Sequence, residues 1–346
     1  MNPLESELSY PLGDALPASG HALEVAPGVR WVRMGLPFAL NHVNLWLVRD
    51  GDGWAVIDCG IANELTRQAW EQVFIHALDG QPVTRVIVTH CHPDHVGLAT
   101  WLCERWNVSL WMTVGEYGFA RMMSAGLAGA DGTAMMPHFR RHGLTDPDKL
   151  ALLEGRKDYY RSMVPQVPEH FIRLEERRPL RIGAHDWRIM IGTGHSPEHA
   201  ALYCASLGLL ISGDMLLPRI STNTSVFAVE PEADAVGQFL DSLQKFLLLP
   251  TDTLVLPSHG KPFRGISERV AQLNAHHAER LEEVRTACAL PQSEADIVPI
   301  MFKRELDMHQ MTFAMGEAIA HLNHLWSLGE LRRIDVHGVL KFVRQD

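Results

Sequence analysis

The feature that most constrains this chain is a run of metal-ligand side chains at the end of an apolar segment. The run reads Thr89-His90-Cys91-His92-Pro93-Asp94-His95, so three imidazoles and one carboxylate fall within six residues. His90 and His92 are two apart, so on an extended chain they project from the same face. Asp94 and His95 follow where a helix is expected to begin, so they approach from another direction. Nitrogen and carboxylate ligands gathered in this way predict a site for zinc, iron or manganese.

Residues of the same types recur at three further places, each after an apolar strand-like segment and beside glycine. They are Gly194-His195, Gly213-Asp214 and Ser258-His259-Gly260. Glycine allows a close approach of backbone and ligand at such positions. A surface loop that happens to be rich in histidine would explain the first run alone. The recurrence favours a metal-binding role for all four places.

The order of the expected elements predicts two regions. Strands and helices alternate over about residues 20–260, which favours an α/β core. Beyond about residue 265 the pattern is nearly all helical, with helices expected over 267–287 and 311–328 and a β-hairpin over 329–343. We therefore expect a catalytic domain over 1–265 and a C-terminal helical region over 266–346. His276 and His277 lie on a charged helix, so we expect both to be exposed to solvent.

Charge and hydropathy exclude several classes of function. The formal net charge is −10 and there is no long basic run, which disfavours binding to a nucleic-acid backbone. No apolar run is long enough to cross a bilayer, and the first residues lack both a basic leader and an apolar stretch, so we expect a cytoplasmic protein without membrane contact. The five cysteines are scattered without a C-x-x-C pair, which predicts neither a disulfide framework nor a thiolate zinc site.

The motifs T-H-C-H-P-D-H, T-G-H-S-P-E-H, S-G-D and P-S-H-G occur in this order. The series resembles the metallo-β-lactamase superfamily of hydrolases over about residues 20–265. The resemblance implies an αββα sandwich, α/β (or α+β) in class, with metals at one edge of two packed sheets. It also implies two sets of metal ligands and one shared residue: His90, His92 and His195 for the first metal, Asp94, His95 and His259 for the second, and Asp214 as the bridge.

The aspartate at position 214 narrows the resemblance. True β-lactamases of the superfamily lack this bridging residue, so the chain looks like the glyoxalase II, lactonase, thioesterase and ribonuclease branches. The segment 214–226 and the helical C-terminal region also resemble lactamase-like proteins with a winged-helix-like tail. Members of that branch include acyl hydrolases and endoribonucleases, so the resemblance leaves the substrate open.

From these features we expect a dinuclear hydrolase of a carboxylic ester-type bond, namely a thioester, a lactone or an ester. Two divalent ions, with Zn²⁺ favoured over iron or manganese, would share a hydroxide that attacks the bond. Asp94 would orient this hydroxide and pass a proton to the leaving group. One alternative is a phosphodiesterase or endoribonuclease, which the acidic charge disfavours. Another is a mononuclear iron protein that oxidises persulfides, or a binding protein without catalysis.

Several further residues are candidates for supporting roles. Asp58 and His199 are expected to hold the ligand imidazoles, although a turn role for Asp58 is equally open. Ser221 and Asn223 either line the substrate pocket or serve the loop, and the loop role is favoured. Two methionine pairs, Met122-Met123 and Met135-Met136, form either core or an adaptable apolar substrate wall. The expected partner is a small molecule such as an acyl thioester or a lactone, and the C-terminal hairpin fits structural capping or a homodimer contact.

Overall fold

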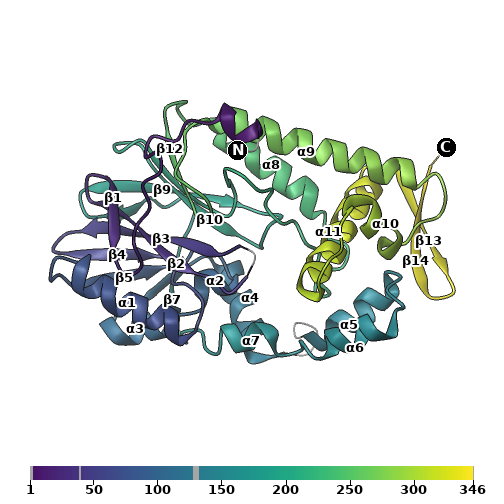
Figure 1. The fold of residues 1–346 in the computed structure, drawn as a ribbon, viewed down its shortest axis with the longest axis horizontal. Helices are drawn as coiled ribbons and strands as arrows, with labels where there is room; N and C mark the ends of the chain where they lie inside the picture. Colours follow the sequence, from purple (N-terminus) through teal and green to yellow (C-terminus); the bar gives the residue numbers. More distant parts are fainter. Residues whose placement is uncertain (1–2, 39, 128–131, 346) are drawn as a thin grey trace.

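The computed structural model of the protein describes residues 3–38, 40–127 and 132–345. Its first layer of strands is a seven-stranded sheet (Figure 1). Its strands follow in chain order: β1 (Ala22–Ala26), β2 (Val29–Gly35), β3 (His42–Asp50), β4 (Gly53–Ile57), β5 (Val83–Ile87), β6 (Leu110–Met112) and β7 (Phe171–Arg173). The first four are joined antiparallel, and β4 to β7 pair in parallel. The parallel half is the part that leads into the first histidine run.

A second sheet of five strands packs against the first. Its spatial order is β12 (Leu254–Pro257), β11 (Leu209–Gly213), β10 (His199–Cys204), β9 (His185–Gly192) and β8 (Leu180–Ile182). The pairs are antiparallel except for β11 with β12, which is parallel. Because β11 and β12 run in the same direction, Asp214 and His259 both lie just beyond the carboxyl ends of their strands, at the same end of the sheet.

The side-chain alternation of the central strands explains why two sheets stack. On β2, Trp31 lies in the core between the sheets while Val32 lies in the core on the other face. On β3, Trp46 likewise lies in the core between the sheets, and Leu45 lies in the core on the other face. A strand with both faces buried needs apolar residues at nearly every position, which is what these segments contain.

Helices cover both outer faces of the sandwich, as the sequence predicted. Trp70 and Leu102 bring the first sheet into contact with α1 (Glu64–His76) and α3 (Ala99–Trp106). On the other side Phe239 and Val270 bring the second sheet into contact with α8 (Ala235–Phe246) and α9 (Ile266–Ala287). The short elements η1 (Pro3–Glu7) and α2 (Pro93–Val96) complete this part. The αββα expectation is confirmed.

The segment between β6 and β7 is a helical insertion. It comprises α4 (Val114–Ala125), α5 (Gly132–Arg141), α6 (Pro147–Glu154) and α7 (Tyr159–Met163). Phe139 and Leu150 from this insertion share a core with Ile319 of the C-terminal region. The insertion thus joins the helical region to the sandwich (Figure 1).

The C-terminal region contains the end of α9, α10 (Glu294–Met301), α11 (Met308–Ser327) and a hairpin of β13 (Leu331–Val336) with β14 (Val339–Arg344). The two long helices and the hairpin match the prediction, whereas α10 was not predicted. It is short and contains Pro299, but the capping box of Ser293 with Asp296 is a sequence signal for its start. Within the described ranges, none of the helices combines the length and the apolar character that a bilayer span requires.

The expected exposure of His277 is wrong. Its side chain is buried because α9 is packed between α8 and α11, where the ring lies beside Phe239 and 5.4 Å from the ring of His321. His276, on the next position of the helix, is half-buried. Charged neighbours along the chain therefore did not indicate which face of α9 points outward.

Candidate metal centre

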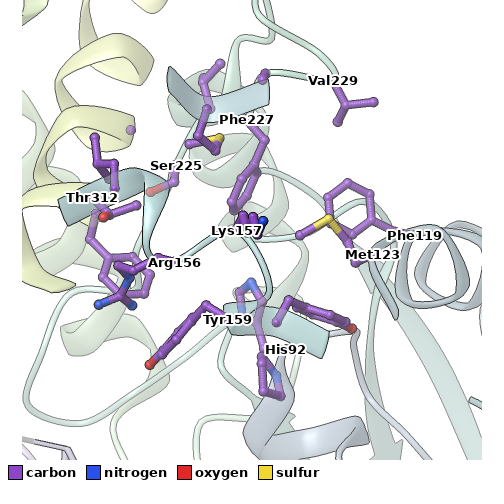
Figure 2. Close-up of a pocket in the computed structure, with 18 of the residues that line it drawn as sticks. His92, Phe119, Met123, Arg156, Lys157, Tyr159, Ser225, Phe227, Val229 and Thr312 are labelled. Carbon is purple, nitrogen blue, oxygen red and sulfur yellow. The ribbon is translucent and has the colours of Figure 1, made fainter. Parts of the chain in front are cut away.

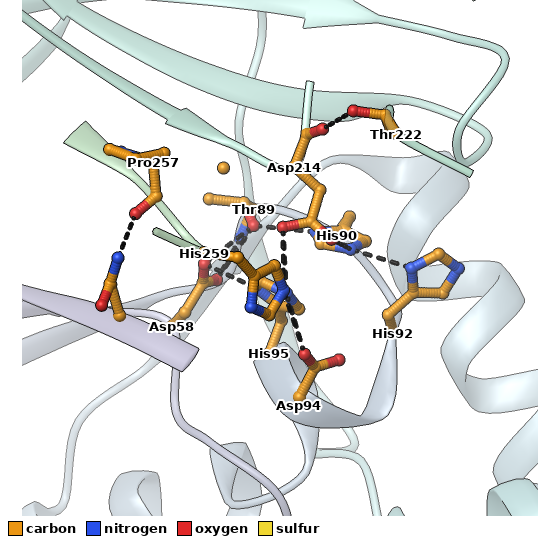
Figure 3. Close-up of polar contacts among 12 residues, drawn as sticks. Asp58, Thr89, His90, His92, Asp94, His95, Asp214, Thr222, Pro257 and His259 are labelled. Carbon is orange, nitrogen blue, oxygen red and sulfur yellow. Dashed lines mark hydrogen bonds and ion pairs between the residues drawn. The ribbon is translucent and has the colours of Figure 1, made fainter. Parts of the chain in front are cut away.

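The four sequence motifs meet at one edge of the sandwich. Figure 3 shows the residues of three of them, with His90, His92, Asp94, His95, Asp214 and His259 close together. The loop after β5 carries His90 and His92, and the short helix α2 carries Asp94 and His95. Three ends of the second sheet supply the others: His195 follows β9, Asp214 follows β11 and His259 follows β12. Both sheets thus contribute side chains to the site, and all seven predicted ligands are brought together.

The first ligand group is formed by His90, His92, His195 and one oxygen of Asp214. The His90 Nε2 atom lies 3.0 Å from His92 Nδ1 and 3.3 Å from His195 Nε2. Asp214 Oδ2 lies 3.5 Å from His195 Nε2 and 3.9 Å from His90 Nε2. The four ligand-type atoms all lie within 4.8 Å of one another.

The second ligand group contains Asp94, His95 and His259. Asp94 Oδ2 lies 3.6 Å from His95 Nε2 and 3.4 Å from His259 Nε2. The other oxygen of Asp214, Oδ1, lies 3.5 Å and 3.4 Å from the same two nitrogen atoms. The Asp214 carboxylate therefore stands between the two groups, with one oxygen toward each.

Apart from the 3.0 Å between His90 and His92, these spacings fit metal ions better than hydrogen bonds. Ligands held at about 2.0–2.1 Å around a tetrahedral ion lie about 3.4 Å apart, whereas hydrogen bonds between nitrogen and oxygen centre near 2.9–3.0 Å. Among the described residues, no hydrogen bond reaches three buried atoms at the site, His95 Nε2, His259 Nε2 and Asp214 Oδ1. Leaving such atoms unpaired is costly, so the residues fit a bound cation.

The remaining ring nitrogens are held by hydrogen bonds that fix the orientation of the imidazoles. The Nδ1–H group of His195 donates to the Asn223 carbonyl at 2.7 Å, and that of His259 donates to the His42 carbonyl at 2.8 Å. His95 Nδ1 lies 2.8 Å from Asp58 Oδ2. A proton on Nδ1 leaves Nε2 with its lone pair toward the ligand group, which is the form that binds a metal.

Asp58 has the supporting position that the sequence suggested. It is buried at the end of β4, and its Oδ1 atom accepts a hydrogen bond from the Thr89 backbone N–H at 2.8 Å. The Thr89 hydroxyl donates to the same carboxylate, and His95 contacts its other oxygen. One carboxylate therefore fixes both the loop before His90 and the ring of His95.

His199 holds the backbone of Asp214. Its Nε2 atom accepts a hydrogen bond from the Asp214 N–H at 3.1 Å. Burial lowers the pKa of His199 to about 3, so the ring is neutral and able to accept. The contact requires Gly213, because a Cβ there would lie 2.3 Å from His199 Nε2 and φ at this residue is +54°.

The histidines of the two ligand groups differ in their tendency to carry a proton. Burial holds the pKa values of His90 and His92 well below the usual range, so both imidazoles stay neutral. Burial also acts to lower the pKa of His95, but Asp94, Asp58 and Asp214 outweigh it and raise the pKa to about 10. Three carboxylates around one imidazole attract positive charge, which is the condition a divalent cation meets.

The segment 222–226 links the ligands to the C-terminal region. The Thr222 hydroxyl donates to the Asp214 carbonyl at 2.5 Å, and the Asn223 carbonyl accepts from His195. The Val226 N–H donates to the Gly316 carbonyl on α11 at 3.2 Å. A Cβ at position 316 would lie 2.7 Å from the Ser225 hydroxyl oxygen, so glycine permits this crossing. Thr222 was missed by the sequence reasoning, although it lies within the segment singled out there.

Neither Ser221 nor Asn223 is among the residues that line the cavity beside His92. Asn223 serves the site through its backbone carbonyl, and its side chain accepts a hydrogen bond from Ser225. Met123 and Met135 line the cavity, and Met135 and Met136 both pack against the core of the helical region. The role of these methionines as a substrate wall stays a prediction.

A buried carboxylate that the sequence did not indicate joins two ligand loops. Glu116 on α4 is fully buried, and its Oε2 atom accepts from the Cys91 N–H at 2.8 Å. Its Oε1 atom accepts from the Ser196 hydroxyl at 2.6 Å and from the Glu198 N–H at 2.7 Å. Cys91 lies between His90 and His92, and Ser196 follows His195. Glu116 thus fixes the spacing between the two loops of the first ligand group.

We expect Glu116→Gln to weaken metal binding by about 10- to 100-fold, the range typical of residues that orient ligands. In either orientation the amide NH₂ faces a backbone N–H, of Cys91 or of Glu198, so one hydrogen bond is lost. Titration of the purified variant with metal in the presence of a competing chelator measures the change. Glu198→Gln is the matched control, because within the described residues its side chain accepts a hydrogen bond from the Gly115 N–H alone, and an amide oxygen can replace that contact. Equal affinities for the two variants would contradict the assignment.

Comparison with known proteins agrees with the geometry. The family model described as metallo-beta-lactamase superfamily matches residues 39–259, and the model described as metallo-beta-lactamase-like, C-terminal domain matches residues 281–345. A Bacillus subtilis protein named probable metallo-hydrolase YqjP is 22% identical over 329 residues, which cover 85% of this chain and 91% of that protein.

Solved structures show the same fold over the whole chain. A beta-lactamase domain protein from Burkholderia ambifaria is 57% identical, with a TM-score of 0.94 and coverage of 99% of this chain and 100% of the other. A metallo-beta-lactamase family protein from Thermus thermophilus is 24% identical, with a TM-score of 0.79 over 93% of this chain and 100% of the other. The chain therefore belongs to the metallo-beta-lactamase superfamily, as a metallo-hydrolase with a His/Asp metal-binding cluster.

Proposed function

We propose that the protein hydrolyses a carboxylic ester-type bond, a thioester, lactone or ester, with two divalent metal ions. The observation that supports two ions is the position of Asp214, whose Oδ2 atom faces the first ligand group and whose Oδ1 atom faces the second. Zn²⁺ suits the nitrogen-rich first group, and iron or manganese would fit the same donor set. When bound, the ions lower the pKa of a shared water and polarise the bond to be cleaved.

The residues of the chain position the reactants and move the proton. The backbone of Asp214 is fixed on both sides: its N–H donates to the His199 ring, and its carbonyl accepts from the Thr222 hydroxyl, so the residue keeps its position between the two ligand groups. The Asp94 side chain is 18% exposed, against 11% for Asp214, and is therefore open to an incoming molecule. We assign Asp94 the transfer of a proton to the leaving group.

The surroundings of the site favour a small molecule as substrate. The cavity beside His92 is lined mainly by aromatic, methionine and aliphatic side chains, which suits an acyl group. The net charge of −10 opposes the association with a nucleic-acid strand that a nuclease requires. These observations support the proposal of an ester-type substrate over a phosphodiester.

Removal of metal should abolish turnover reversibly. The purified protein is expected to hold about two equivalents of metal, and chelation should reduce hydrolysis of thioester, lactone and ester substrates by about 10³-fold or more, since metal ions supply several kcal/mol of transition-state stabilisation. Return of Zn²⁺, Fe²⁺ or Mn²⁺ in separate samples should restore it and identify the effective metal.

Two results would contradict this function. One is a metal content below about half an equivalent after loading, since the paired ligand groups would then have no occupant. The other is turnover of bis-nitrophenyl phosphate without turnover of any ester, thioester or lactone.

A further inference from the structure

A cavity of about 180 Å³ opens beside the first ligand group, with His92 as part of its wall (Figure 2). Three separate parts of the chain enclose it. The insertion contributes residues of α4, α5, α6 and α7, the segment 225–229 contributes a second wall, and Phe313 and Gly316 of α11 contribute the third. The C-terminal region is therefore part of the wall around the space next to the ligands.

The wall of this cavity is mostly apolar. Its apolar side chains include Phe119, Met123, Met163, Phe227 and Phe313, and the residues that line it include no aspartate or glutamate. Methionine and phenylalanine together give a surface that adapts to an apolar ligand. An apolar cavity of about 150 Å³ accommodates a benzene ring, so this one holds an apolar group of about six carbons, with room to extend through the opening.

Two cationic side chains stand on the same wall. The Arg156 guanidinium lies over the Tyr159 ring, 3.9 Å from its centroid, and is half-buried. Lys157 is exposed to solvent, and in the described part of the chain no carboxylate forms an ion pair with it. Figure 2 shows both cations in the same view as His92 and the aromatic side chains. A wall with two cations and no carboxylate selects for negative charge.

We propose that this cavity binds an amphiphilic anion, whose apolar acyl chain fills the space beside His92 and whose negative group pairs with Lys157 and Arg156. The inference rests on the proposed function in one respect only, namely that this anion is the substrate whose bond is cleaved. The negative group lies at the opening, because Lys157 is exposed there. The acyl chain lies against the aromatic and methionine side chains.

Binding can be measured without turnover. Calorimetric titration of the metal-loaded protein with 1-octanesulfonate, 1-butanesulfonate and octyltrimethylammonium, all below their micelle concentrations, separates chain length from charge. We expect one octanesulfonate per chain, bound at least tenfold more tightly than butanesulfonate, because four fewer methylene groups are buried. Octyltrimethylammonium should bind at least tenfold more weakly than octanesulfonate. Equal binding of the cation, or no dependence on chain length, would overturn the inference.

Three variants locate the site. Lys157→Glu should weaken octanesulfonate binding at least tenfold and improve that of octyltrimethylammonium. Phe313→Asp should weaken both, and its 40% exposure leaves the fold able to accept the change. Lys149→Glu is the control, since it makes the same charge change on α6 at a residue outside the cavity lining and should leave both affinities unchanged. An effect of Lys149→Glu as large as that of Lys157→Glu would mean that overall charge, rather than this cavity, governs binding.

The outcomes distinguish this inference from the proposed function. If octanesulfonate binds as expected but no ester-type bond is cleaved, the proposed function is wrong and the cavity assignment stands. If octanoyl thioesters are cleaved but octanesulfonate does not bind, the cavity assignment is wrong and the hydrolase assignment stands. A KM for octanoyl thioesters that rises in Lys157→Glu, with kcat unchanged, would support both.

Discussion

Asp214→Ala is expected to remove metal from both ligand groups and to reduce hydrolysis by about 10³-fold or more, since the ions supply several kcal/mol of stabilisation in the transition state. The substitution deletes the only side chain among the seven ligands that faces both groups. It also leaves His95 Nε2 and His259 Nε2 with Asp94 as their shared acidic neighbour. Elemental analysis of the loaded variant, together with kcat/KM, measures the result.

His92→Ala provides the comparison within the site. His92 belongs to the first ligand group only, so this variant should retain about one ion per chain and lose turnover. Asp252→Ala, in the exposed turn before β12, is the control for loss of an acidic side chain and should behave as the unsubstituted protein. Two ions retained in Asp214→Ala, with circular dichroism showing an intact fold, would refute the bridging role.

Gly213→Ala should have the second largest effect. An added Cβ would lie 2.3 Å from His199 Nε2 and 2.4 Å from His199 Cε1, so the ring must move and the hydrogen bond from the Asp214 N–H is lost. The left-handed backbone adds its own penalty, and together these should destabilise the fold by about 2–4 kcal/mol. Displacement of Asp214 should lower metal affinity by about 10- to 100-fold.

The same strand supplies a matched control for this substitution. Gly208 precedes β11 with φ at +64°, and nothing lies within 4 Å of the Cβ position there. Gly208→Ala should therefore cost only about 1 kcal/mol, from the backbone conformation, and leave metal affinity unchanged. Thermal unfolding and metal titration of both variants compare the two positions. Equal losses of metal affinity would mean that the His199 contact has no part in holding Asp214.

Four of the seven ligands could be predicted from the sequence because each lies within three residues of the end of an apolar strand. That position is local information, and it places His90, His195, Asp214 and His259 at the ends of strands before any contact is known. Asp58 was identified for the same reason, since it follows β4 directly. The division into two regions rests on the change in pattern near residue 265 and stays a prediction.

Glu116 could not be found in this way. It lies within a helix, at a position without a motif, and its hydrogen bonds reach Ser196 and Glu198, which are 80 and 82 residues away in the chain. The cavity was hidden for a similar reason, because its walls come from three distant segments. His277 was assigned to solvent from its charged neighbours, whereas packing against Phe239 buries it. These features depend on tertiary contacts that local pattern does not specify.

The crossing of α11 over the segment 222–226 limits how such a protein can diversify. A side chain larger than hydrogen at position 316 would displace Ser225, and the same short segment carries the carbonyl that orients His195. A substitution on α11 at this crossing would therefore move the segment 222–226 and, through the Asn223 carbonyl, the ring of His195. Exchange of this region between relatives, as in gene recombination, would alter ligand orientation together with the cavity wall. Replacement of the helical region would therefore change the cavity wall and the orientation of His195 in one step.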